Sequence, residues 1–268
     1  MNMNLHKEKY ALVTGASKGI GFGYCKLLLQ KGFNLICIAR DLSSINTLKE
    51  QYPNSDIKEI EADLSDYNSV YKVFESVKTL DIALLINNAG FGVWGPFKDT
   101  NLERELNMID LNIKTLHIFT KLFVEKFIQQ GYGRIINIGS IASFMPGPNF
   151  SSYFASKAYV LSLGQAINTE LKKTKSKVRV VTICPGPIKT DFWKNSNFKE
   201  NNKKESIKTS DTDKFCKKSL NKALKTKNKN YILVGLKNKL LVSLSKRAPQ
   251  KLVLNNVYSQ MKQKKSQG

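Results

Sequence analysis

The chain has 268 residues, of which 41% are hydrophobic and 10% aromatic, so its composition excludes a disordered protein and suits one large α/β domain. The formal net charge is +22, and the excess lies at one end, because residues 194–268 hold 20 of the 43 Lys and Arg but only 4 of the 21 Asp and Glu. The excess is nearly all lysine, which lacks the planar guanidinium fork that reads phosphates and base edges. We therefore expect no nucleic-acid partner, whereas a weak association with an anionic membrane surface stays open.

Metal binding, secretion and membrane insertion find no support in the sequence. The two histidines and four cysteines show no zinc-ligand spacing, so we expect no metal site. Cys25, Cys37 and Cys184 lie in apolar stretches and are interpreted as buried thiols. The first nine residues are polar, and no apolar run approaches the roughly 20 residues of a membrane span. A cytoplasmic location is the expectation.

Apolar runs alternate with helical patterns along most of the chain. Helical spacing predicts helices over 21–31, 42–51, 67–77, 102–129 and 153–172. Short runs typical of strands occupy 10–13, 34–38, 57–61, 81–86, 134–138, 178–183 and 231–234. Continuous apolar strands separated by helices are typical of a parallel sheet that is covered on both faces. We therefore predict a single α/β domain over 1–268, with a Rossmann-like, doubly wound parallel sheet of about seven strands and helices on both faces.

The pattern breaks down after the sixth predicted strand. Residues 189–229 are rich in Asn, Lys, Ser and Asp, and show no steady period until a helix predicted over 215–224. Because loops of this length in compact domains are usually functional or disordered, we interpret 189–229 as a substrate lid region. Two basic amphipathic helices are expected over 236–245 and 251–261, within a basic segment that spans 236–268.

A glycine-rich turn follows the first predicted strand and leads directly into a helix. It reads Thr14-Gly15-Ala16-Ser17-Lys18-Gly19-Ile20-Gly21. Glycines allow a tight turn and a close approach of the backbone to a pyrophosphate, which the N–H groups of a helix amino terminus attract. Since the turn belongs to a strand–helix–strand unit, it predicts a dinucleotide site more strongly than a glycine cluster alone would.

The end of the second predicted strand indicates which dinucleotide is bound. An acidic residue there would bind a free ribose hydroxyl, whereas arginine accommodates a 2′-phosphate. The chain has Arg40 followed by Asp41, with Lys18 in the turn before. Arg40 and Lys18 together predict NADP(H), and the prediction weakens towards NAD(H) if Asp41 faces the ribose instead.

Tyr153 and Lys157 form a candidate acid/base pair. They are four residues apart on a predicted helix and therefore share one face. Tyrosine is a poor acid/base near neutral pH because its pKa is about 10, and a neighbouring ammonium group favours the phenolate and lowers that pKa. Such a pair can serve as a general acid and base.

Other polar or small segments also follow predicted strands. Ser140 ends the fifth, Asn87-Asn88-Ala89-Gly90 follows the fourth, and Cys184-Pro185-Gly186-Pro187 follows the sixth. In a doubly wound sheet the ligand lies beyond the carboxyl ends of the strands. These segments therefore converge on one edge of the predicted sheet.

The motifs resemble those of the short-chain dehydrogenase/reductase family, in a broad bacterial-type subgroup. Matching pieces occur in family order from about Lys9 to Phe192, and they comprise residues 14–21, Asp63, 87–90, Asn112, Ser140, Tyr153-x-x-Ser156-Lys157 and 185–190. The resemblance implies an NADP-dependent oxidoreductase that moves a hydride between nicotinamide and a small-molecule carbonyl or secondary alcohol. It also implies a homodimer or homotetramer assembled through helices 102–129 and 153–172.

The resemblance assigns roles to individual residues. Tyr153 would protonate the substrate oxygen, Lys157 would hold the nicotinamide ribose, Ser140 would polarise the carbonyl, and Asn112 would support a water-linked proton relay. The residues expected to bind the cofactor are Gly15, Ser17, Lys18, Gly19, Ile20, Gly21, Arg40, Asp63, Leu64, Asn88, Ala89, Gly90, Tyr153, Lys157, Pro185, Gly186, Ile188 and Thr190.

Structural explanations stay open beside these roles. Ser140 and Asn112 could cap or bridge the backbone, and Asp63 could cap a helix, while Thr14 and Asn87 are expected to tie adjacent strands. The substrate could be a bulky hydrophobic or lipid-like ketone in an apolar pocket. The candidate pocket residues, which could equally pack in the hydrophobic core, are Phe91, Trp94, Phe144, Met145, Phe192 and Trp193.

Two functions without turnover compete with the enzyme hypothesis. One is a catalytically silent nucleotide-binding protein, but such proteins usually lack one of the Tyr, Lys, Ser and Asn positions, and all four are present here. The other is a membrane-surface interaction protein that would use the basic carboxyl-terminal segment.

Overall fold

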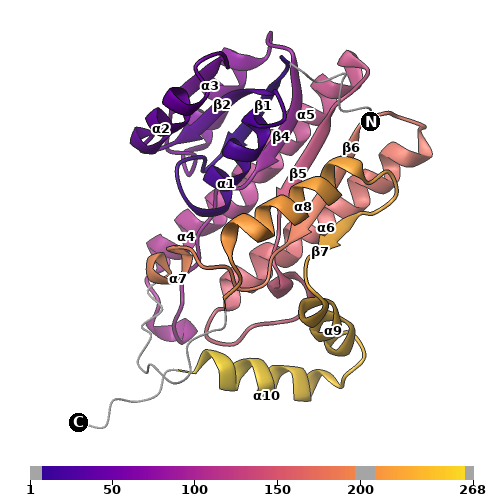
Figure 1. The fold of residues 1–268 in the computed structure, drawn as a ribbon. Coiled ribbons are helices and arrows are strands. Elements are labelled where there is room, and N and C mark those ends of the chain that lie inside the picture. Colours follow the sequence, from indigo (N-terminus) through magenta and orange to yellow (C-terminus); the bar gives the residue numbers. More distant parts are fainter. Residues whose placement is uncertain (1–7, 197–208, 263–268) are drawn as a thin grey trace.

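The computed structural model describes residues 8–196 and 209–262, which are built around one parallel sheet (Figure 1). Its strand order is β3-β2-β1-β4-β5-β6-β7. The strands are β1 (Tyr10–Thr14), β2 (Asn34–Ala39), β3 (Ile57–Glu61), β4 (Ile82–Asn87), β5 (Arg134–Ile138), β6 (Arg179–Cys184) and β7 (Tyr231–Leu233). Each lies within one residue of a predicted strand, and the predicted fold class is confirmed.

Helices cover both faces of the sheet (Figure 1). One face packs against α1 (Gly19–Leu29), α2 (Asn46–Gln51) and α8 (Thr212–Lys225) through a cluster that includes Tyr24, Leu48 and Phe215. The other face packs against α3 (Tyr67–Val77), α5 (Leu116–Gln130) and α6 (Ser151–Lys173). Burial on both faces explains why the central strands are continuously apolar.

The helix predicted over 102–129 is interrupted. It consists of α4 (Leu102–Ile109), a π-helical segment (Asp110–Thr115) and α5. Asn112 lies in the π-helical segment, where its side chain bonds to the backbone of Phe91. π-helical segments are rare in proteins, and those that occur are often found at functional sites. The π-helical segment coincides with the contact between Asn112 and Phe91, which lies outside the helix. The spacing of apolar residues within the helix could therefore not predict this segment.

The lid prediction is wrong for α8, which belongs to the hydrophobic core. Its Phe215 and Cys216 are buried in the same cluster as α1. Gly23 allows the close approach of the two helices, because a Cβ there would lie 2.9 Å from the Cys216 sulfur. The buried Arg134 side chain fixes the end of α8 by donating to the carbonyls of Ala223 (2.6 Å) and Thr226 (3.0 Å). Residues 197–208 of the predicted lid lie outside the described residues.

The two predicted carboxyl-terminal helices are present beside the carboxyl edge of the sheet (Figure 1). They are α9 (Leu236–Ser245) and α10 (Gln250–Met261). Residues 263–268 of the basic segment are outside the described part of the chain. Within the described part, no helix combines the length and the apolar character that crossing a membrane requires.

Candidate active site

The candidate site begins at the glycine-rich turn, where the strand order reverses between β1 and β4. Gly15 and Gly19 have φ angles of +63° and +56°, in the left-handed region that favours glycine. A Cβ on Gly21 would overlap the Gly15 carbonyl oxygen. The turn is therefore a tightly packed loop that presents backbone to the space above it, in the place where doubly wound sheets bind dinucleotides.

Polar side chains hold this turn against the segment after β4. The Thr14 hydroxyl accepts hydrogen bonds from the backbone N–H groups of Asn88 and Ala89, both at 3.0 Å. The Asn88 amide donates to the carbonyls of Thr14 (2.9 Å) and Gly15 (3.1 Å). Asn87 donates to Asn137 (2.9 Å) and Thr120 (3.2 Å). The structural roles expected of Thr14 and Asn87 are confirmed, and Asn88 shares them.

A continuous cavity of about 3170 Å³ runs from this turn across the carboxyl edge of the sheet. All the residues expected to bind the cofactor line it except Gly21, which lies behind the turn. Ser140, Tyr153 and Lys157 line it as well, whereas Asn112 does not. The cavity therefore brings together the predicted nucleotide and catalytic residues, and its glycine-rich turn and the cations Lys18 and Arg40 fit a dinucleotide.

One end of the cavity carries the residues expected to recognise the ribose 2′ position. Lys18, Arg40 and Asp41 all line it. The Asp41 carboxylate accepts hydrogen bonds from the Ser43 hydroxyl (2.7 Å) and N–H (3.0 Å), and these bonds hold its pKa below the usual range. Asp41 therefore holds the following turn through Oδ1, and Arg40 and Lys18 are the cations that line this end of the cavity.

Asp63 lies further along this part of the cavity. Its carboxylate accepts hydrogen bonds from the Ser65 N–H (2.9 Å) and hydroxyl (2.7 Å), which lower its pKa, and the nearby Arg40 charge acts in the same direction. The bonded oxygen is Oδ1 in both cases. Asp63 therefore holds the turn at Ser65 and still lines the cavity, whereas Asp66 caps α3, so the helix-capping role considered for Asp63 is not found.

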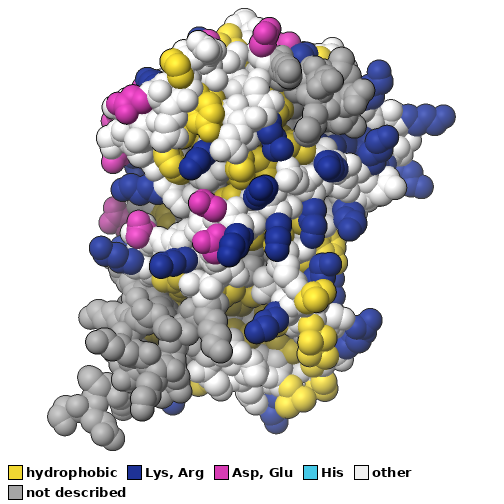
Figure 2. Space-filling model, in the orientation of Figure 1, with side chains coloured by type: hydrophobic (Ala, Val, Ile, Leu, Met, Phe, Trp, Pro, Cys, Tyr) yellow, Lys and Arg dark blue, Asp and Glu magenta, His cyan; other side chains and the backbone are white. Residues whose placement is uncertain are grey.

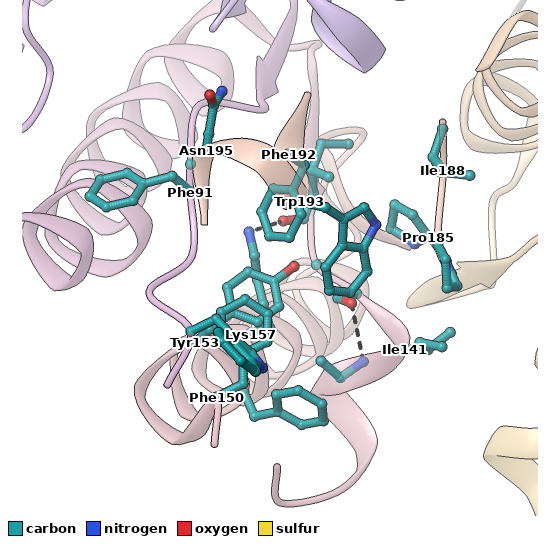
Figure 3. A pocket seen from close by; sticks show the side chains of 18 of the residues that line it. Phe91, Ile141, Phe150, Tyr153, Lys157, Pro185, Ile188, Phe192, Trp193 and Asn195 are labelled. Carbon is teal, nitrogen blue, oxygen red and sulfur yellow. Dashed lines mark hydrogen bonds between the residues drawn. The ribbon is translucent and has the colours of Figure 1, made fainter. Parts of the chain in front are cut away.

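Tyr153 and Lys157 lie one turn apart near the start of α6, with the ammonium nitrogen 5.7 Å from the centre of the phenol ring (Figure 3). Burial raises the pKa of Tyr153 to about 12, against the influence of its Ser140 hydrogen-bond partner. Burial lowers the pKa of Lys157 to about 8, and its ammonium donates to the Ile138 carbonyl at 2.9 Å. Lys157 is not among the groups that shift the Tyr153 pKa in the chain alone, where burial has the largest influence.

Ser140 is placed at the end of β5 by hydrogen bonds to its neighbours, and its hydroxyl also pairs with the Tyr153 phenol. Its oxygen accepts from the Ala142 N–H at 3.1 Å, and its own N–H donates to the Ser143 hydroxyl at 3.2 Å. The side chain therefore caps the short turn Ile141–Phe144 and places its hydroxyl beside the Tyr153 phenol in the cavity.

Asn112 connects the π-helical segment to both walls of the site. Its amide donates to the Phe91 carbonyl (2.9 Å) and the Ser156 hydroxyl (3.2 Å), while its oxygen accepts from the Phe91 N–H (3.1 Å). A Cβ on Gly90 would lie 2.7 Å from this oxygen and 3.5 Å from the Lys157 nitrogen. Asn112 thus bridges backbone next to Lys157, and its side chain is occupied.

An aromatic wall surrounds the Tyr153 phenol (Figure 3). The Phe150 ring stacks on it with ring centres 4.5 Å apart, and Phe192, on the short helix α7 (Phe192–Asn195), lies 5.2 Å away. Of the side chains expected in an apolar pocket, Phe144 does not line the cavity and packs 5.3 Å from Tyr231. The others do, namely Phe91, Trp94, Met145, Phe192 and Trp193.

Many residues that line the cavity were missed from the sequence, among them Phe150 and a group on α10. Phe150 lies in a stretch without helical or strand spacing, so nothing marked it. Val253, Val257 and Met261 of α10 close the apolar end, and the Trp94 indole N–H donates to the Met261 carbonyl at 3.1 Å. Their four-residue spacing is a signal that one face of α10 packs against the body.

Comparisons with known proteins agree with this architecture. The family model for short chain dehydrogenases matches residues 9–201. An uncharacterized oxidoreductase of Staphylococcus epidermidis is 32% identical over 210 residues, which cover 76% of this chain and 89% of the relative.

Two solved structures extend the likeness over most of the chain. A short-chain dehydrogenase from Sphingobium yanoikuyae in complex with NADPH is 25% identical, with a TM-score of 0.78 and coverage of 96% and 98% of the two chains. A bulky-bulky ketone specific alcohol dehydrogenase from Comamonas testosteroni is 26% identical, with a TM-score of 0.73 and coverage of 89% and 92%. The chain therefore belongs to the short-chain dehydrogenase family and is an NAD(P)-dependent oxidoreductase.

Proposed function

We propose that this protein interconverts a bulky hydrophobic ketone and its secondary alcohol with NADP(H), and that Tyr153 is the general acid and base. The observation that carries the proposal is the position of the buried Tyr153 phenol, with Ser140 and Lys157, in the same cavity as the glycine-rich turn. Proton donor, carbonyl-polarising group and nucleotide cradle then face a common space.

The cofactor is NADP(H). Arg40 and Lys18 line the cavity where a 2′-phosphate would lie, and Asp41 is engaged with Ser43. The Sphingobium relative was solved with NADPH. Arginine suits this position because its planar fork forms charge-assisted hydrogen bonds with phosphate oxygens.

The side chains around the reacting carbonyl supply proton and hydrogen-bond chemistry. Bound NADPH would supply the hydride. Tyr153, with a pKa of about 12, holds its proton at neutral pH and can give it to the substrate oxygen, while the Ser140 hydroxyl donates to that oxygen. Lys157, with a pKa of about 8, is largely charged at neutral pH and stabilises the phenolate that remains.

The walls of the cavity support a bulky apolar substrate. Phe150, Phe192 and Trp193 surround the phenol, and Val253 and Val257 of α10 extend the same hydrophobic cluster. Apolar walls with few polar groups are typical of pockets that select ligands by shape. The Comamonas relative, named for bulky-bulky ketones, supports this substrate class.

Tyr153→Phe tests the mechanism. We expect the rate of NADPH oxidation with a panel of bulky ketones to fall by about 10³-fold, because the proton donor is lost. The affinity for NADPH, measured by fluorescence titration, should change less than about fivefold, since one hydrogen bond contributes about 1 kcal/mol to binding.

Tyr159→Phe is the matched control on the same helix. Tyr159 is partly exposed and pairs with His117 at 2.7 Å, and it does not line the cavity, so turnover should be retained. An unchanged rate in Tyr153→Phe would exclude the mechanism. Failure of the wild-type chain to bind NADPH or NADH would favour the membrane-surface hypothesis over the enzyme.

A further inference from the structure

The helix α9 carries an exposed apolar face on the outside of the molecule. Leu236, Leu240 and Leu244 follow one another at four-residue spacing, so they share a face, and they are 82%, 62% and 58% exposed. Val242, on the opposite side of the helix, is buried. Figure 2 shows hydrophobic side chains gathered over this helix. With Leu241 and Leu252, which are also exposed, they form what we call the leucine surface.

Cations surround the leucine surface. The exposed residues on and between the two helices include Lys237, Lys239, Lys246, Arg247 and Lys251. Residues 214–268 contain 15 Lys and Arg and no Asp or Glu at all. A large apolar patch on a protein surface calls for an explanation, and here the same helices combine it with a one-sided positive charge.

We propose that the leucine surface docks this protein onto an anionic lipid bilayer. A helix with leucines on one face and lysines beside them lies in the plane of the bilayer, with its apolar side chains about 5–10 Å deep and its cations at the headgroups. Each Lys or Arg near an anionic surface strengthens binding about fivefold. A bilayer therefore offers an apolar interior to the leucines and anionic headgroups to the cations.

The charge distribution argues against the other occupants. A symmetric contact with a second copy would place the same patch against itself, and would bring Lys237, Arg247 and their neighbours against identical cations. A nucleic acid would pair with the cations but would leave the exposed leucines without an apolar partner. Arg247 is also the one arginine among residues 214–268.

The docking surface adjoins the cavity. Leu240, Leu241, Leu244 and Leu252 line the cavity and are also exposed to solvent. If the proposed function holds, a ketone dissolved in the bilayer would reach Tyr153 along this wall without crossing bulk water. Docking itself does not depend on the reaction.

Co-sedimentation of the full chain with lipid vesicles tests the proposal. We expect binding to vesicles that mix phosphatidylserine with phosphatidylcholine, weak binding to phosphatidylcholine alone, and a loss of binding as salt screens the charges. The triple variant Lys239→Gln, Arg247→Gln, Lys251→Gln should lose about 100-fold in affinity. These three residues lie outside the cavity lining.

A second triple variant controls for net charge. Lys72→Gln, Lys98→Gln and Lys121→Gln remove the same charge from exposed lysines on α3, the loop before α4, and α5, and should change the affinity less than about fivefold. Leu240→Ser with Leu244→Ser should weaken binding at least about tenfold by removing the apolar part of the contact. Tyr67→Ser with Tyr71→Ser changes two exposed side chains on α3 and should not weaken binding to the vesicles.

Three outcomes would overturn the proposal. The first is equal binding to vesicles with and without phosphatidylserine, and the second is equal loss in the two charge variants. The third is binding of a duplex DNA oligonucleotide that is lost in the Lys239, Arg247, Lys251 variant but kept in the leucine variant. That result would assign the surface to nucleic acid. Turnover of a water-soluble ketone by the Lys239, Arg247, Lys251 variant reports the enzyme function separately from docking.

Discussion

Lys157 is a cation held in a buried site, which is unfavourable for folding. Its side chain is 6% exposed, and burial lowers its pKa from 10.5 to about 8. A hydrogen bond to the Ile138 carbonyl at 2.9 Å offsets part of the lost hydration. Residues that destabilise the fold are expected mainly at functional sites, where their position serves the reaction, and Lys157 lies in the candidate site.

The free energy of unfolding should therefore rise with pH between about 8 and 10.5. In this window the unfolded lysine is protonated and the folded one is neutral, so the unfolded state binds more protons and stability increases with pH, by about 3 kcal/mol in total. Lys157→Met lacks this contribution. The variant should be about 2 kcal/mol more stable than the wild type at pH 7 without cofactor, and should lose that advantage by pH 10.

Urea unfolding of both proteins at pH 7 and pH 10 measures the effect, and groups common to both cancel in the difference. Lys121→Met provides the control, because Lys121 is an exposed lysine in an ion pair with Glu125 and should show no pH-dependent difference of this size. A stability difference between wild type and Lys157→Met that is constant over this pH range would contradict the assignment of a depressed pKa to Lys157.

Most strands were predictable because they are short apolar runs buried on both faces, which leaves a clear pattern in the sequence. β3 differs, since its run Ile-Lys-Glu-Ile-Glu is partly exposed at the edge of the sheet. The helix boundaries were less so. α1 begins at Gly19, earlier than predicted, and the segment over 42–51 begins with a 3₁₀ turn (Ser43–Ile45) before α2. These ends depend on local contacts, such as the hydrogen bond from the Ser43 N–H to the Asp41 carboxylate, which hydrophobic spacing does not report.

The candidate site was predictable where it follows strand ends, and unpredictable where distant elements close over it. Ser140 and Tyr153 could be placed because their elements end or begin at the carboxyl edge. The contribution of α10 depends on the chain folding back from α9, which no local pattern shows. The tyrosine pKa was misjudged for a related reason, because burial by Phe150 and its neighbours is a tertiary property.

Gly164 sets how closely α6 approaches the sheet. A Cβ at this position would overlap the Thr182 hydroxyl on β6. Glycine inside a helix usually costs about 1 kcal/mol relative to alanine, so Gly164→Ala would stabilise an isolated helix. Here we expect the opposite, a loss of about 1–3 kcal/mol, because threonine is a stiff, branched side chain that cannot move aside.

The double variant Gly164→Ala with Thr182→Ala identifies the cause of that loss. Thr182 Oγ1 is buried with no hydrogen-bond partner in the described structure, so its removal sacrifices no bond and makes room for the new methyl group. Chemical denaturation should show recovery of most of the lost stability. If the double variant is as unstable as the sum of the single variants, the overlap with Thr182 does not control the packing of α6.

The molecule also exposes large apolar side chains on the helices of one sheet face. Leu102, Leu106 and Ile109 of α4, with Ile128 of α5 and Tyr159 of α6, are at least one third exposed. These are the two helical segments through which the family resemblance implies a homodimer or homotetramer. They carry acidic residues next to the basic ones, unlike the leucine surface, so a symmetric contact here need not set like charges against each other.

We predict that α4 and not α9 carries the contact between copies. Leu106→Glu with Ile109→Glu should reduce the molar mass measured by light scattering at micromolar concentration, since two buried carboxylates would face two identical ones across the symmetric contact. Leu240→Ser with Leu244→Ser should leave the molar mass unchanged. A fall in mass only in the α9 variant would move the contact between copies to the leucine surface and exclude docking of that surface onto a bilayer. A wild-type chain that is monomeric in the same experiment would contradict the predicted homo-oligomer.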